Sequence, residues 1–301
     1  MTLIEFFDKD TIKNILSVLT IKPDRIVYIY DSAVTDDKYF AALKKCFKKH
    51  LPGIKLEKIP VDINNVRDIY GKTYDVIKKY GDCVMELTGG SELMMIAGHR
   101  AGLDGHIRMY YTDIAAGKIM DIDDPDFTMD TVRLTLDDFM DAKGAQFVGE
   151  SHREPDEKNY DSILNMCHYI FKDLRNWSYT CGYLQAVNSV MEYGLNFSAN
   201  MTFIHKDGRK YRPNPGMLEA FEKNGFIKNL SMSNNRVSFT YLYPEAKTYM
   251  TTYGLWLEMF VFISAKRLGK FSDVKLGAMI DWDAYDDIRA AGNEIDVIIM
   301  E

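Results

Sequence analysis

The chain has 301 residues, of which 47% are hydrophobic and 27% are charged, so it can bury more than one core and two domains are expected. The net charge of −7 repels nucleic-acid phosphates, which excludes a polybasic binder and requires a local basic patch for any nucleic-acid contact. The acidic start MTLIEFFDKD is unlike a signal peptide, and no apolar run reaches the roughly 20 residues of a membrane span. These features predict a cytoplasmic protein.

The cysteine and histidine patterns restrict the metal chemistry. The four cysteines stand far apart without a Cys-x-x-Cys pair, and the six histidines form no His-x-x-x-His pair. A zinc site and a disulfide framework are therefore both unfavoured. A metal would have to bind carboxylates, a donor set that favours Mg²⁺ or Mn²⁺.

The first 115 or so residues alternate between short apolar runs and amphipathic helical patterns, which is typical of a parallel sheet with crossover helices. This half is predicted to be α/β. Its strands are expected at residues 25–30, 54–60, 83–87 and 107–112. The helices between them are expected at residues 36–50, 64–80 and 91–104. A short hairpin that turns at Gly117 is expected at residues 115–122.

The first domain is expected to span residues 1–148, because the polar segment GESHREPDEK at 149–158 has the composition of a linker. Helical periodicity follows at residues 160–176, 182–193 and 215–224. Two alternating runs, 226–233 and 236–243, are joined through Asn234-Asn235, so the segment 159–248 resembles a winged-helix element. The last block, 249–301, is expected to hold a helix at 254–268 and strands at 275–281 and 293–300.

The sharpest local signal is ELTGGSELMMIAG, from Glu86 to Gly98. It follows a predicted parallel strand and opens a helix, so the amides of its Thr-Gly-Gly-Ser run form an anion site at a helix N-terminus. The simpler interpretation is a strand-to-helix turn with Ser91 as the N-cap. Ligands bind at the carboxyl edge of such sheets, and the first predicted strand ends there in a second small polar loop, Asp31 to Asp37.

The run Thr88-Gly89-Gly90-Ser91-Glu92-Leu93-Met94 resembles the Thr-Gly-Gly-Thr/Ser-x-x-Met pattern of the CARF (CRISPR-associated Rossmann fold) domain. The resemblance covers Met1 to about Lys143 and implies a Rossmann-like sensor that pairs as a homodimer and binds a cyclic oligoadenylate, with cyclic tetra-adenylate as the expected allosteric activator. Glu92 departs from the family, in which many members carry Lys. The ligand-binding residues that the resemblance implies are Asp31, Ser32, Ala33, Thr35, Thr88, Gly89, Gly90, Ser91, Glu92 and Met94, and more weakly Tyr111, Thr112 and Asp113.

A second signal is a series of acidic residues in the last block: Glu258, Asp281, Glu294 and Asp296. Acidic residues within apolar elements are costly unless they are paired or bind a metal, and Glu294 and Asp296 share one side of a strand. Taken singly, these acids are more simply explained as exposed or element-end residues.

Taken together, helix Glu, strand Asp and the Asn-Glu-Ile-Asp strand resemble the PD-(D/E)XK nuclease core of CARF-fused effector nucleases. The resemblance implies catalytic residues among these four acids, with Asp296, Glu258 and Asp281 as ligands of Mn²⁺ or Mg²⁺. The core also needs a following Glu-x-Lys strand, and the sequence stops at Glu301 before one. We therefore expect an incomplete active site.

The resemblance implies a cyclic-oligoadenylate-activated, metal-dependent endonuclease of type III CRISPR defence, a hydrolase acting on single-stranded or nicked DNA or on RNA. Two other functions stay open: a ligand-responsive transcription regulator that uses the winged helix, and a ring nuclease that degrades its own activator. The cluster HKDGRKYR (205–212), with four cations around Tyr211, fits a nucleic-acid contact and a solvated hairpin loop equally well.

Overall fold

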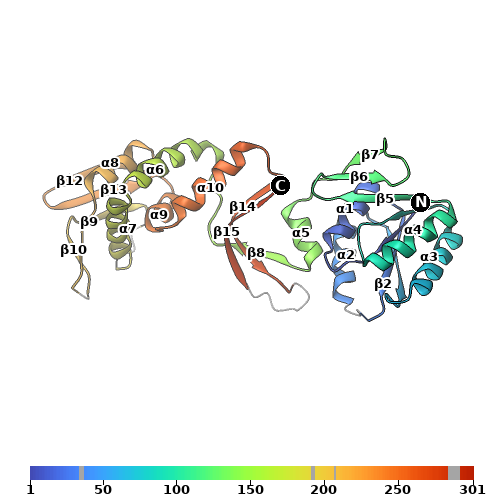
Figure 1. Ribbon diagram of the computed structural model, residues 1–301. Helices are drawn as coiled ribbons and strands as arrows, with labels where there is room; N and C mark the ends of the chain where they lie inside the picture. The colour runs from blue at the N-terminus through green and yellow to red at the C-terminus, as the bar shows by residue number, and fades with distance from the viewer. Residues whose placement is uncertain (34–36, 191–193, 207, 284–291) are drawn as a thin grey trace. The chain divides into compact units, whose positions relative to one another are not determined.

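The computed structural model describes residues 1–33, 37–190, 194–206, 208–283 and 292–301. They form two compact units (Figure 1). Unit 1 contains residues 1–149 and 279–293, and unit 2 contains residues 150–278 and 294–301. Among the described residues, no helix is long and apolar enough to cross a membrane.

Unit 1 is built on a seven-stranded sheet in the order β3-β2-β1-β4-β5-β6-β7. The first five strands in this order are parallel, whereas β6 and β7 are antiparallel. The elements are β1 (Thr2–Phe6), α1 (Ile12–Ile21), β2 (Arg25–Asp31), α2 (Asp37–His50), β3 (Lys55–Val61), α3 (Val66–Tyr80), β4 (Cys83–Glu86), α4 (Glu92–Gly105), β5 (Arg108–Asp113), β6 (Lys118–Asp121), β7 (Thr128–Asp130) and α5 (Leu136–Lys143).

Helices α1, α2 and α5 cover one face of this sheet and α3 and α4 cover the other. The four predicted strands, the three predicted helices and the hairpin at Gly117 are all present, within two residues of their expected bounds. The sequence patterns did not predict β1, the strand at the centre of the parallel part, nor α1, β7 and α5. The predicted first strand is therefore β2, and the loop that begins at Asp31 follows the second strand.

Unit 2 has one hydrophobic core, to which its helices and its three-stranded sheet β12-β13-β9 contribute. The ribbon of β12 and β13 turns as predicted at Asn234-Asn235, where both residues have a positive φ. The predicted helix 160–176 instead ends at Lys172, and α7 begins at Leu174, with Asp173 as its N-cap. The elements are η1 (Glu157–Asn159), α6 (Tyr160–Lys172), α7 (Leu174–Asn188), β9 (Asn196–Asn200), β10 (Phe203–Ile204), β11 (Lys210–Tyr211), α8 (Pro215–Lys223), β12 (Ile227–Ser233), β13 (Arg236–Tyr241), α9 (Pro244–Thr251) and α10 (Leu255–Leu268).

A further three-stranded sheet has the order β15-β14-β8 and is divided between the two units. Its strands are β8 (Gln146–Glu150), β14 (Asp273–Asp281) and β15 (Asn293–Met300). Both β14 and β15 were predicted from the sequence. The bounds confirm the strand on which Glu294 and Asp296 were placed.

Candidate functional site

The candidate ligand site of unit 1 lies where the strand order reverses. Strand β1 pairs with β2 on one side and with β4 on the other. In open α/β sheets this reversal leaves a crevice outside the carboxyl ends of the two central strands. The loop from β1 to α1 and the Thr88–Ser91 loop from β4 to α4 are therefore the two that border the crevice.

The Thr88–Ser91 loop has the geometry of an anion site. Ser91 is the N-cap of α4, as the interpretation of this segment as a strand-to-helix turn predicted. Its hydroxyl oxygen accepts a hydrogen bond from the Met94 amide at 3.3 Å. Within the described part of the chain, the amides of Gly89, Gly90 and Ser91 donate no hydrogen bond. These donors remain available at the N-terminus of a 14-residue helix, where a negative charge is stabilised.

The two glycines of this loop are also needed for packing. A Cβ added at Gly89 would lie 2.4 Å from the carbonyl oxygen of Phe6. One added at Gly90, which has φ +83°, would lie 2.7 Å from the Cβ of Phe6. Side chains at these positions would collide with the end of β1. The two glycines therefore allow the loop to pack against that strand.

Glu86, the last residue of β4, holds the loop in place. Its carboxylate accepts hydrogen bonds from the Thr88 amide at 2.9 Å, the Thr112 amide at 3.0 Å and the Thr112 hydroxyl at 2.9 Å, and also from the Thr88 hydroxyl. Glu86 is only 1% exposed. One buried acid thus ties the loop to the end of β5, and the side chains of Thr88 and Thr112 are already engaged there.

A second buried carboxylate lies beside Glu86. Glu5 of β1 is fully buried and is the register partner of Glu86, so both side chains point to the α1 face of the sheet. Glu5 accepts from the Ser17 hydroxyl and from Asn14 Nδ2 at 3.4 Å. Burial, followed by the charge of Glu86, raises the pKa of Glu5 well above its ordinary range. Burial also raises the pKa of Glu86, whereas the hydrogen bonds from Thr88 and Thr112 lower it.

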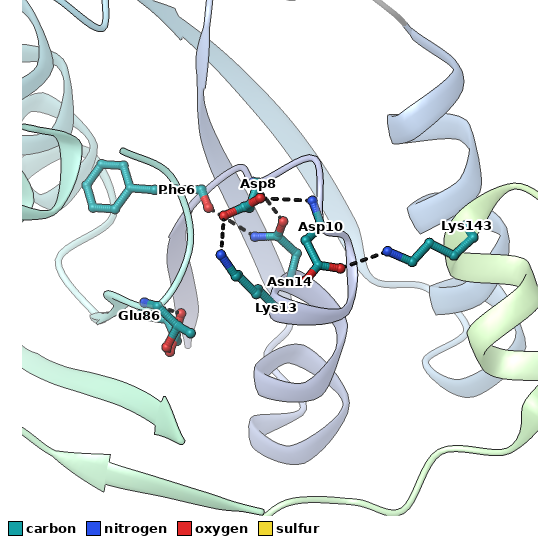
Figure 2. A network of polar contacts seen from close by, with 8 residues as sticks. Phe6, Asp8, Asp10, Lys13, Asn14, Glu86 and Lys143 are labelled. Atoms are coloured by element: carbon teal, nitrogen blue, oxygen red, sulfur yellow. Dashed lines mark hydrogen bonds and ion pairs between the residues drawn. The ribbon is translucent and has the colours of Figure 1, made fainter. Parts of the chain in front are cut away.

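The loop after β1 is acidic and internally bonded, as Figure 2 shows. Asp8 pairs with Lys13 at 2.8 Å and accepts from the Asp10 amide at 2.8 Å. Asp10 pairs with Lys143 of α5 at 2.7 Å. Asn14 accepts from the Asp8 amide and donates to the carbonyl of Phe6 at 3.0 Å, which fixes the loop on the end of β1. The one cation of the first turn of α1, Lys13, is thus held by Asp8.

The remaining predicted ligand residues differ in how accessible they are. Asp31 is half-buried and accepts from the Ala33 amide at 2.9 Å, while Ser32 and Ala33 are exposed. Glu92 is exposed, but Met94 is only 2% exposed and packs in the core, so its side chain does not line the crevice. Tyr111 is 43% exposed and Asp113 is half-buried at the end of β5. Thr35 lies outside the described residues.

Unit 2 brings three of the four predicted acids into one electrostatic group. Burial and then the charges of Asp296 and Glu294 raise the pKa of Glu258 on α10. Glu294 and Asp296 are both exposed and lie on the same side of β15. Oxygen donors of this kind suit a hard divalent cation. Across the described residues, however, no three His, Cys, Asp or Glu side chains are close enough to form a metal site.

Asp281, the fourth predicted acid, belongs to unit 1. It is 4% exposed and accepts hydrogen bonds from Gln146 Nε2 at 3.1 Å and from the Asp283 amide at 3.0 Å. Two donors thus already satisfy its carboxylate at the end of β14.

Comparison with known proteins adds three structures that share this fold. Neither a protein-family model nor a curated protein sequence matches the chain. Can2 from Sulfobacillus thermosulfidooxidans in complex with cyclic tetra-adenylate is 14% identical, with a TM-score of 0.67 over 100% of this chain and 76% of that one. VC1899 from Vibrio cholerae is 14% identical, with a TM-score of 0.73 over 99% of this chain and 77% of that one.

A type III CRISPR defence DNA nuclease activated by cyclic oligoadenylate is also 14% identical, with a TM-score of 0.55 over 100% of this chain and 38% of that one. These matches extend through both units rather than covering the Rossmann-like sheet alone. The resemblance drawn from the Thr-Gly-Gly-Ser run is confirmed for the fold, because this chain shares the α/β fold of these three solved structures.

Proposed function

We propose that unit 1 is a sensor that binds a cyclic oligoadenylate, with cyclic tetra-adenylate as the first ring to test. The observation that carries the proposal is the row of unbonded amides at Gly89, Gly90 and Ser91 in the β1/β4 crevice. Such amides bind phosphate oxygens without a cationic side chain. The likeness of the whole chain to Can2, which was solved with cyclic tetra-adenylate, supports the same ligand class.

Isothermal titration calorimetry with rings of three, four and six adenylates tests this proposal. We expect measurable binding of at least one ring, and weaker binding as salt rises, because the contacts are to phosphates. Absence of binding by all three rings to the folded chain would refute the proposed ligand.

The acidic loop after β1 predicts a gain of affinity in one variant. Asp8→Asn keeps an oxygen that accepts from the Asp10 amide but removes the charge that holds Lys13. Lys13 is then released toward a phosphate, and one repulsive charge is lost from the rim. We expect an anionic ring to bind about three- to tenfold more tightly, equal to roughly 1 kcal/mol of electrostatic free energy. Calorimetry measures the change, with Asp130→Asn on β7 as the charge control, and weaker binding by Asp8→Asn would contradict the prediction.

We also propose that the chain forms a homodimer through α4. Leu93, Ile96 and Leu103 are 39%, 61% and 45% exposed, and their spacing places them along one side of the helix that begins at the glycine loop. A contact between two such helices would bring the two Gly89-Gly90-Ser91 rows near one two-fold axis, where a symmetric ring can meet both.

The double variant Ile96→Asp/Leu103→Asp should convert the dimer to a monomer, because the two carboxylates would be buried in an apolar contact. Light scattering coupled to gel filtration measures the mass. The control variant Ile204→Asp/Leu268→Asp changes two apolar residues of unit 2 that are each 59% exposed, and it should leave the mass unchanged. An unaltered mass in the α4 variant would exclude this face as the interface.

For unit 2 we propose a metal-dependent endonuclease activity, switched on by the ring. Glu258 and Asp296 would hold a divalent cation such as Mn²⁺ or Mg²⁺, with Glu294 beside them. When bound, such a cation would supply the chemistry of lowering the pKa of a water molecule, so that hydroxide is available at neutral pH. The raised pKa of Glu258 supports the proposal: burial is the largest cause, the charges of Asp296 and Glu294 raise it further, and a cation would offset that repulsion.

Incubation with plasmid, single-stranded DNA and RNA, with and without each ring and with Mn²⁺ or Mg²⁺, tests the activity. We expect cleavage only when both ring and metal are present and a Glu-x-Lys strand completes the core. Cleavage that does not depend on the ring would separate the nuclease proposal from the sensor proposal.

A further inference from the structure

A basic hairpin in unit 2 belongs neither to the crevice nor to the acidic group. Strands β10 and β11 pair with Ile204 opposite Lys210 and Phe203 opposite Tyr211. Phe203 and Tyr211 pack inward on the core of unit 2. Because neighbouring strand residues point to opposite faces, Ile204 and Lys210 point outward, and Ile204 is 59% exposed.

The hairpin concentrates positive charge in a chain whose net charge is −7. Four cations lie within seven residues: Lys206, Arg209, Lys210 and Arg212. All four are exposed. Lys206, Lys210 and Arg212 form no ion pair with any residue that the structure describes. Neighbouring cations without counter-charges repel one another, so Lys206, Lys210 and Arg212 are suited to an external polyanion.

The β10–β11 hairpin contacts helix α7 (Figure 1). A Cβ built at Gly182 lies 3.7 Å from the ring of Tyr211, and the Asn214 amide donates to the Thr180 hydroxyl at 2.9 Å. Tyr179 is three residues before Gly182, which places it on the same side of α7. Tyr179 is 52% exposed, and the Arg175 guanidinium lies over its ring, 5.7 Å from the ring centroid.

We infer that the outer face of the β10–β11 hairpin and the adjoining face of α7 bind single-stranded nucleic acid. Lys206, Lys210 and Arg212 contact successive phosphates, and the exposed ring of Tyr179 stacks with a base. A cationic track beside an aromatic ring is how proteins bind single strands without reading their sequence, whereas a base within a duplex is not free to stack on a side chain. The role of this surface in holding a substrate rests on the proposed nuclease function, but its binding is measurable without cleavage.

Fluorescence anisotropy of a short labelled oligonucleotide, with EDTA and without any cyclic oligoadenylate, tests the inference. We expect Lys210→Glu/Arg212→Glu to weaken binding by about tenfold or more and to reduce the slope of log K against log salt by about 1.4, or about 0.7 for each phosphate contact. The matched variant Lys223→Glu/Lys228→Glu makes the same charge change at exposed positions of α8 and β12. It should alter the affinity by less than about threefold.

The tyrosine is tested by two further variants. Tyr179→Ala should weaken binding of the single strand by at least about fivefold, whereas Tyr179→Phe, which keeps the ring, should not. Equal losses in the two charge-reversal variants, or equal affinity of the wild-type chain for single strand and duplex, would overturn the inference. Calorimetric titration with cyclic tetra-adenylate on the same proteins separates the proposals: a wild-type chain that binds the ring but no oligonucleotide refutes this surface alone.

Discussion

Replacement of Glu86 by alanine should lower the free energy of unfolding by about 3 kcal/mol and weaken ring binding by more than about tenfold. The carboxylate accepts from the amides and hydroxyls of Thr88 and Thr112 in a site that is 1% exposed. Each buried donor that loses its acceptor costs about 1–3 kcal/mol. The loop whose amides face the crevice would also lose its anchor. Urea unfolding and calorimetry with cyclic tetra-adenylate measure the two effects.

Two amide variants show whether the charge or the shape of these carboxylates accounts for the losses of stability and ring binding. Glu86→Gln keeps one oxygen for the Thr88 amide, while the hydroxyls can rotate to accept from the new NH₂ group, so its loss should be smaller than that of Glu86→Ala. Glu5→Gln should be tolerated, because the amide oxygen can accept from Asn14 Nδ2 and its NH₂ group can donate to Ser17 and Glu86. Equal losses in Glu86→Ala and Glu5→Gln would contradict the division of roles within the pair.

The pair also predicts a pH dependence. Burial and the charge of Glu86 raise the pKa of Glu5 in the folded state above its ordinary value of 4.5. As pH rises above that value, the unfolded chain releases this proton while the folded chain retains it, so the contribution of Glu5 to stability falls until the folded-state pKa is passed. Glu5→Gln cannot titrate and should gain stability relative to the wild type over this range. Burial also raises the pKa of Glu86, which is present in both proteins, so the comparison isolates the loss of the Glu5 carboxyl.

The sequence predicted most elements of unit 1 but not its central strand. Residues 25–31 and 83–86 were found because short apolar runs stood between clear turn signals. Strand β1 is only five residues long and has Glu5 in it, and an ionisable residue normally argues against a buried strand. Its burial depends on Asn14, Ser17 and Glu86, which are distant in sequence. The run Asp10-Thr11 before the apolar pattern of α1 was the local signal that could have located the helix.

The unpredicted strand β1 changes which loop is the neighbour of the glycine loop. The Thr88–Ser91 loop was placed correctly, because its glycines and N-cap are local signals. The second loop was assigned to residues after Asp31, whereas the strand order puts the loop containing Asp8 and Asp10 beside the glycine loop. Strand order depends on which strands pair across the sheet, and no single-sequence periodicity contains that information. The acids of β15 were easier to group, since alternate strand residues always share a face.

Asp296→Asn should reduce ring-activated cleavage by at least about 100-fold, because it removes a charged oxygen ligand while keeping the size of the side chain. Glu258→Gln should have a comparable effect. Ring binding should be unchanged in both, since the crevice is in unit 1 and the two acids are in unit 2. Cleavage rates measured with saturating cyclic tetra-adenylate and Mn²⁺, in a protein whose core is completed by a Glu-x-Lys strand, give the ratio.

Two matched variants limit the interpretation of that loss. Glu294 lies two residues from Asp296 on the same side of β15, at the exposed start of the strand. We therefore expect Glu294→Gln to lose less cleavage activity than Asp296→Asn. Glu219→Gln removes an exposed carboxylate from α8 and should leave cleavage unchanged. Full activity of the Asp296→Asn protein would show that the chemistry lies elsewhere.

A stability measurement distinguishes a metal-binding acid from a structural one. Burial and the charges of Asp296 and Glu294 raise the pKa of Glu258, so its ionised form is less favourable in the folded chain than in the unfolded chain. With EDTA present, stability should therefore fall as pH rises through this pKa, and Glu258→Gln should be slightly more stable than the wild type near neutral pH. With Mn²⁺ the order should reverse, because only the wild type gains free energy from the cation. A Glu258→Gln protein that is less stable than the wild type in EDTA would identify Glu258 as a structural residue.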